Sequence, residues 1–188
     1  MSRSAGTNVP VILSMHTLLF RLLLACASVV AYAGLVQFTP YLEALDDVPY
    51  VSTVFHLLVG AVFGALVLVP YVRVPHRVLR GVALAAASAA IYYFTIRFVV
   101  SGPAGLSALA TFMIAGVCAA LLCGAAVAVI APQPFSLRLA SLLIVAGAVG
   151  GAVFHARISF DPNLLLGHAA WQLLVCVALY FGQRNAPT

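Results

Sequence analysis

The chain consists of long apolar runs separated by short polar breaks. No Asp, Glu, Lys or Arg occurs in residues 22–42, 48–72, 81–96, 98–137, 139–154 and 162–183. A helix that crosses a bilayer needs about 20 apolar residues. Inside hydrocarbon every backbone N–H and C=O must find a partner within its own segment. Each run therefore predicts a transmembrane helix.

The run 98–137 is too long for one helix. Turn signals divide it at 101–103 (S-G-P) and at 132–134 (P-Q-P), which leaves one long helix between them. The pattern as a whole predicts an all-α, polytopic membrane bundle of six transmembrane helices, formed by a single transmembrane domain over 1–188. The expected helices span about 17–38, 49–72, 78–98, 104–131, 137–156 and 163–182.

Composition supports this class and excludes others. Hydrophobic residues make up 64% of the chain and charged residues 7%, whereas a soluble domain has about 25% charged residues. The nine basic residues are all arginines and are spread singly along the chain, so they form no basic run of the kind that binds nucleic acid.

The arginines also predict an orientation, because cytoplasmic loops are enriched in basic residues. With the N-terminus inside, seven arginines fall on the inner side and two, Arg97 and Arg157, on the outer side. Both termini are therefore expected in the cytoplasm, in a multi-pass protein of a bacterial inner membrane. The A-Y-A segment at 31–33 leaves open a cleaved signal peptide, which would not change the orientation of the other five helices.

Small residues mark the expected helix contacts. Two G-x-x-x-G motifs, Gly60 with Gly64 and Gly147 with Gly151, allow close approach of helices. They serve either the internal bundle or a homo-oligomer, and membrane lipids are the other expected partners. Aromatic residues near the predicted span ends, among them Tyr92 and Trp171, are typical of the interfacial aromatic belt.

Polar residues within spans are costly and are hypotheses of function by default. His56, His155 and His168 all fall in the outer half of their predicted helices, beneath loops that contain Asp46 and Asp47. Three histidines at one depth suit a zinc ion with an open fourth position for water. Asp46 or Asp47 is then the candidate orienting residue or base. Ser52 precedes His56 by one helical turn.

Two segments carry a resemblance to a known family. Segment 52–56, S-T-V-F-H, resembles the S-x-x-F-H segment of alkaline ceramidases, members of the CREST superfamily of membrane hydrolases. Segment 167–174, G-H-A-A-W-Q-L-L, resembles the H-x-x-W-H-L-L segment of their last helix. The resemblance implies a zinc-dependent hydrolase of lipid amide or ester bonds, with His56 and His168 as ligands and Ser52 as the assisting hydroxyl. Gln172 replaces the family's second histidine, so the third ligand would be His155.

The layout also resembles that of rhomboid proteases, which have six core helices and an active site open to the outside. His56, Ser101 and His168 reproduce their order of catalytic residues, which implies an intramembrane serine protease. A non-enzymatic assembly or structural subunit is the further alternative. In that case each histidine bonds to a neighbouring helix or to interfacial water.

Overall fold

The structure is a computed structural model that describes residues 11–37, 51–72, 76–157 and 165–183, with side chains from Thr17 onward in the first range and from Thr53 in the second. Its main elements are α1 (Val11–Val36), α3 (Val51–Phe63), α4 (Arg77–Ser101), α5 (Ala108–Ile130), α6 (Leu137–Arg157) and α7 (Leu165–Gln183). Counting α3 with its continuation, the described residues form six helices long and apolar enough to cross a membrane. The predicted all-α membrane bundle is therefore confirmed.

The second span differs from the single α-helix expected over 49–72. After α3 the chain continues as a π-helical segment, η1 (Gly64–Leu68), and then as a 3-10 turn, η2 (Val69–Tyr71). Pro70 lies in η2 and has no backbone N–H to donate to the preceding turn. The helix therefore loses its regular hydrogen bonding before the span ends, and Val72 is extended.

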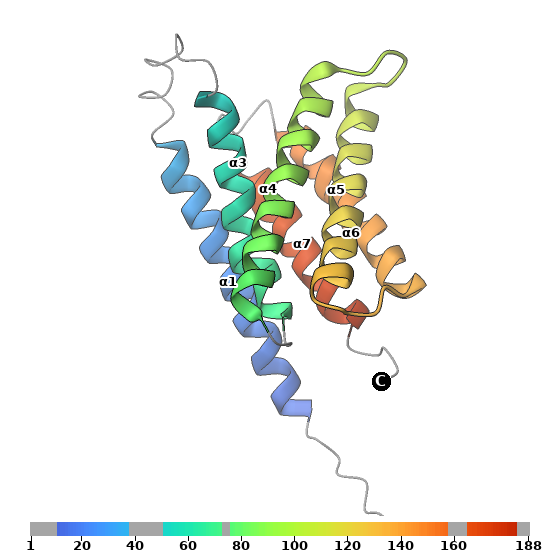
Figure 1. The fold of residues 1–188 in the computed structure, drawn as a ribbon. Helices are drawn as coiled ribbons and strands as arrows, with labels where there is room; N and C mark the ends of the chain where they lie inside the picture. Colours follow the sequence, from blue (N-terminus) through green and yellow to red (C-terminus); the bar gives the residue numbers. More distant parts are fainter. Residues whose placement is uncertain (1–10, 38–50, 73–75, 158–164, 184–188) are drawn as a thin grey trace, which may run out of the picture.

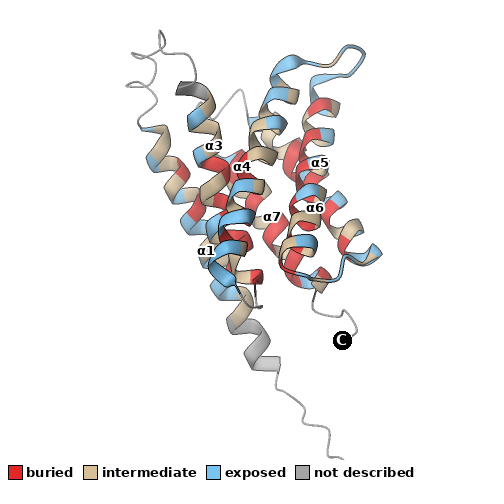
Figure 2. Cartoon of the chain, in the orientation of Figure 1, coloured by how far each residue is buried: buried red, intermediate tan, exposed pale blue. Residues whose placement is uncertain are grey.

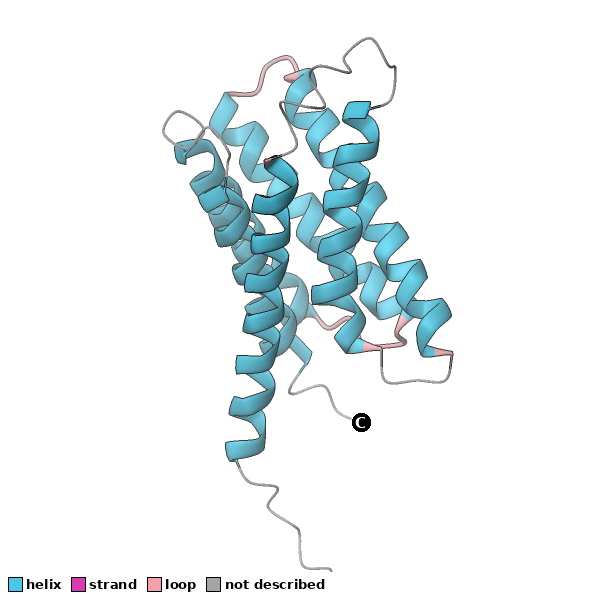
Figure 3. Ribbon diagram, turned by 90° about the vertical axis from the view of Figure 1, so that its left-hand side faces the viewer, coloured by secondary structure: helices cyan, strands magenta, loops and turns pink. Residues whose placement is uncertain are grey.

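Successive helices run in opposite directions and close into a bundle (Figure 1). Each helix packs against its neighbour in sequence, and α1 also contacts α7, which completes the ring. The start of α1 and the end of α7 lie at the same end of the bundle, and a view turned by 90° agrees (Figures 1 and 3). Arg21, Arg77, Arg80 and Arg138 belong to this end, which we call the arginine-rich end, whereas Arg97 and Arg157 belong to the opposite end.

The predicted break near 101–103 is a turn built on two glycines. Gly102 ends α4 with φ 56°, and its N–H bonds to the Val99 carbonyl. Gly105 has φ 85°, a second left-handed conformation that disfavours residues with a Cβ. Ser107 then caps α5, since its hydroxyl accepts from the Ala110 N–H at 3.2 Å.

Both G-x-x-x-G motifs are buried between helices of the same chain. A Cβ added at Gly60 would lie 2.7 Å from the Ala89 Cα, and one at Gly64 would lie 2.8 Å from the Ala85 Cα, so α3 and η1 rest on the alanine-rich part of α4. Gly147 and Gly151 of α6 approach the backbone of α5 equally closely. Small residues thus set the distance between neighbouring helices, as expected where lipid provides no hydrophobic driving force between them.

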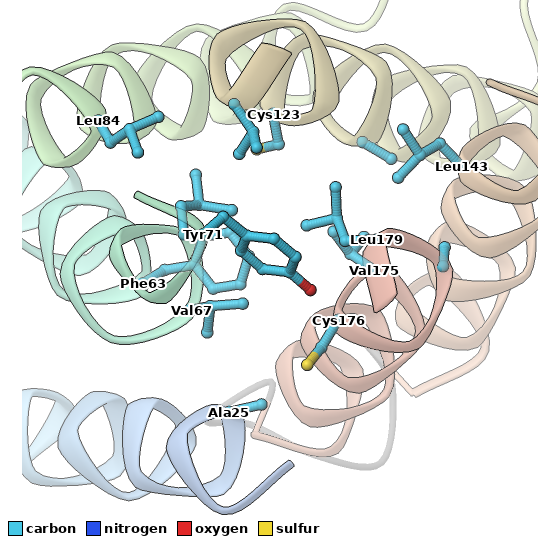
Figure 4. Close-up of a cluster of buried hydrophobic side chains, with 14 of the residues drawn as sticks. Ala25, Phe63, Val67, Tyr71, Leu84, Cys123, Leu143, Val175, Cys176 and Leu179 are labelled. Carbon is cyan, nitrogen blue, oxygen red and sulfur yellow. The ribbon is translucent and has the colours of Figure 1, made fainter. Parts of the chain in front are cut away.

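The largest buried side chains gather in the half of the bundle nearer the arginine-rich end. Tyr71 lies at the centre, surrounded by residues from all six spans, including Ala25, Leu84, Cys123, Leu143 and Leu179 (Figure 4). Buried positions face the interior of the bundle, while exposed positions lie on its outer surface (Figure 2). The outer surface is nevertheless largely apolar, with exposed residues such as Leu23, Val82 and Val129.

The predicted orientation can be tested at two exposed positions of opposite ends. Ala104 lies in the α4–α5 turn and His76 precedes α4 at the arginine-rich end. In a variant without the four native cysteines, we expect a cysteine at Ala104 to react with a membrane-impermeant maleimide in intact cells. A cysteine at His76 should react only after the membrane is permeabilised, and the reverse pattern would invert the orientation.

Candidate functional site

His168 is a buried polar residue enclosed by aromatic rings. It lies in the first turn of α7, is only 3% exposed, and its Nε2 is 3.0 Å from the Tyr92 hydroxyl of α4. Its ring centroid is 4.0 Å from that of Tyr32 on α1 and 4.9 Å from that of Phe154 on α6. Four helices therefore meet at this imidazole, and its hydrogen bond to Tyr92 offsets the cost of burying it.

The three predicted zinc ligands lie at the same end of the bundle, and each packs against aromatic rings. Tyr92 packs near two of them: its ring centroid lies 6.3 Å from that of His56 and 5.6 Å from that of His168. His155 packs against Phe112, and the centroids of these two rings are 5.6 Å apart. Among the residues that the structure describes, no group of three His, Cys, Asp or Glu could hold a metal ion.

The remaining predicted site residues fall where the structure gives no side chain. Asp46 and Asp47 lie outside the described residues, and Ser52 is described only as a backbone position in α3. The roles predicted for them, and the zinc site itself, stay predictions that a metal analysis of the purified protein would test. Ser101, named by the protease resemblance, is exposed at the end of α4, and its hydroxyl donates to the Phe98 carbonyl at 2.8 Å.

A narrow apolar cleft of about 80 Å³ lies between α4 and α5, and His168 forms part of its wall. From Ser88 to Val99 its α4 wall extends about 16 Å, at 1.5 Å per residue. Tyr92 and His168 provide polar atoms at its wall, and Trp171 lies on its α7 side. The other lining residues are almost all apolar, including Ile91, Ile96, Phe112, Ala115, Ala119 and Phe154.

Two residues expected in an interfacial aromatic belt lie inside the bundle instead. Tyr92 bonds to His168, as described above. The Trp171 indole packs on Gly150, where an added Cβ would lie 2.7 Å from the Trp171 Cδ1, and its Nε1 donates to the Gly116 carbonyl at 3.3 Å. The belt prediction was wrong for both residues, because position along a helix fixes depth but not the direction of the side chain.

Further buried polar residues continue from His168 along the facing sides of α1 and α7. Ser28 and Tyr32 are one turn apart on α1, and His168 and Gln172 are one turn apart on α7; all four are buried. The Gln172 Oε1 has no hydrogen-bond partner among the described residues. Sequence reasoning selected His168 and Gln172 but missed Ser28, Tyr32 and Tyr92. The i, i+4 spacing of Ser28 and Tyr32 was the signal that could have identified the α1 pair.

Comparisons with models of protein families, with curated proteins and with solved structures each give no match to this chain.

Proposed function

We propose that this protein binds a lipophilic molecule with a carbonyl group in the cleft between α4 and α5. The supporting observation is the His168–Tyr92 hydrogen bond at the wall of a mostly apolar cleft. Ligand sites are typically apolar cavities in which a few polar groups fix the orientation of the ligand. At about 80 Å³ the cleft would enclose the carbonyl group and the adjacent part of an alkyl chain, and the rest of the chain would extend outside it. Hydrolysis of a lipid amide or ester, the activity implied by the family resemblance, is a narrower proposal for the same kind of molecule.

The hydrogen bond to His168 leaves the Tyr92 hydroxyl able to donate to such a ligand. When Nε2 carries the ring proton, it donates to the Tyr92 oxygen, and the Tyr92 O–H is then the donor for a ligand carbonyl. Hydrogen-bond chains of this kind polarise one another in a low-dielectric site. The apolar walls formed by residues such as Ile96 and Ala115 suit an alkyl chain.

The cleft contains its own spectroscopic reporter, because Trp171 is the only tryptophan in the chain. Decylubiquinone combines carbonyl acceptors with an alkyl tail and quenches tryptophan fluorescence. We expect saturable quenching in the purified protein in detergent. Tyr92→Phe keeps the ring but removes the hydroxyl, and it should weaken binding about tenfold, the effect of losing one buried hydrogen bond of about 1.4 kcal/mol.

Tyr93→Phe is the matched control, since Tyr93 follows Tyr92 on α4 but does not line the cleft. It should leave the quenching curve unchanged. Bromododecane, a quencher without a carbonyl, should quench the parent and Tyr92→Phe equally. Quenching by decylubiquinone that does not saturate, or that is identical in Tyr92→Phe and the parent, would contradict the proposed function.

A further inference from the structure

A second cavity, of about 360 Å³, lies at the arginine-rich end between α1, the η1–η2 segment and the start of α4. Arg21 of α1 and Arg77 of α4 both line it. The rest of its lining is mainly apolar and includes Phe20, Leu24 and Leu66. The cavity therefore combines two cations with an apolar wall at the end of two membrane spans, Thr17–Val36 and Arg77–Ser101.

Arg21 is unusual because it is a buried cation. It is only 8% exposed, and its guanidinium carbon lies 3.8 Å from the centre of the Tyr71 ring and 5.7 Å from that of Tyr180. Stacking on an aromatic ring stabilises the charge of an arginine but leaves the N–H groups at the edge of the guanidinium to find acceptors. These rings therefore hold Arg21 in place without neutralising it.

No carboxylate in the described part of the chain can neutralise these two arginines. All four acidic residues, Glu43, Asp46, Asp47 and Asp161, fall outside the described residues. Arg80, the next cation on α4, is already bonded to the Ile130 carbonyl at 2.8 Å. Two like charges on one cavity repel each other unless an anion lies between them.

We propose that this cavity binds the phosphate of an anionic phospholipid. Arg21 and Arg77 are the proposed phosphate ligands, because guanidinium groups match phosphate oxygens in geometry and charge. The apolar residues Phe20, Leu24 and Leu66 would contact the acyl chains that leave the headgroup. A lipid is favoured over a free phosphate ion because the cavity lies at the end of membrane spans and most of its wall is apolar.

Native mass spectrometry of the full-length protein in detergent, titrated with defined lipids, tests the proposal. We expect dioleoyl-phosphatidylglycerol to bind about tenfold more tightly than dioleoyl-phosphatidylcholine. Arg77→Gln should abolish most of this preference, because one charge-assisted phosphate contact contributes about a factor of ten in affinity. Arg77 is exposed, so this variant keeps the fold even if Arg21→Gln does not.

Arg97→Gln is the matched control, because Arg97 is an exposed arginine on the same helix at the opposite end. It should bind phosphatidylglycerol like the parent. Equal affinity for the two lipids, or equal weakening by Arg77→Gln and Arg97→Gln, would overturn the proposal. Competition by sodium phosphate without any preference for phosphatidylglycerol would assign the cavity to a soluble phosphate and would overturn the lipid assignment.

Discussion

Gly147→Leu is expected to destabilise the protein by at least about 3 kcal/mol, at the upper end of the effects of overpacking. A Cβ at Gly147 would lie 2.6 Å from the Val117 Cα and 2.7 Å from the Gly116 carbonyl carbon. Both atoms belong to the α5 backbone, so no change of rotamer can relieve the contact. The two helices would have to separate along their whole crossing. Thermal unfolding in detergent, followed by circular dichroism, measures the effect.

Gly34→Leu is the control for this substitution. Gly34 lies on α1, and an added Cβ there meets no atom within 4 Å. The exchange should leave the melting temperature unchanged or raise it slightly, because leucine favours helix over glycine by up to about 1 kcal/mol. If both variants unfold like the parent, the close crossing of α5 and α6 does not determine stability.

Trp171→Ala is expected to lower the free energy of unfolding by about 3–5 kcal/mol, the range for removing a packed aromatic side chain. Trp171 connects three other helices: it packs on Gly150 of α6, its ring centroid lies 5.4 Å from that of Phe63 on α3, and its indole N–H donates to Gly116 of α5. Its removal opens a void that neighbouring backbones cannot fill. The resulting loss of dispersion contacts should appear as a lower melting temperature.

Phe94→Ala provides the comparison for an aromatic residue outside the bundle. Phe94 is 68% exposed on α4, where detergent or lipid replaces the contacts that the side chain makes. We expect the free energy of unfolding of this variant to lie within about 0.5 kcal/mol of that of the parent, as is usual for surface substitutions. A Phe94→Ala variant as unstable as Trp171→Ala would show that the effect does not depend on the position of Trp171 in the bundle.

Structural features that depend only on position along the chain were predicted well from the sequence. The six spans follow from the lengths of the apolar runs, and the turns follow from Gly102 and the prolines between α5 and α6. The G-x-x-x-G motifs marked close helix contacts correctly, since a missing side chain is visible in the sequence itself. The end of the second span departs from a regular helix because Pro70 interrupts its hydrogen bonding, and sequence analysis did not anticipate this.

The direction in which each side chain points was decided only by the tertiary structure. In a soluble helix the polar face marks the solvent side, but here both the lipid and the bundle interior are apolar. α5, for example, has no charged residue over Ala108–Ile130, so its pattern does not identify an inner face. The sequence by itself determined six membrane-spanning helices and the shared depth of three histidines. The fold decided that His168 bonds to Tyr92, that His56 packs near the same tyrosine, and that His155 packs against Phe112.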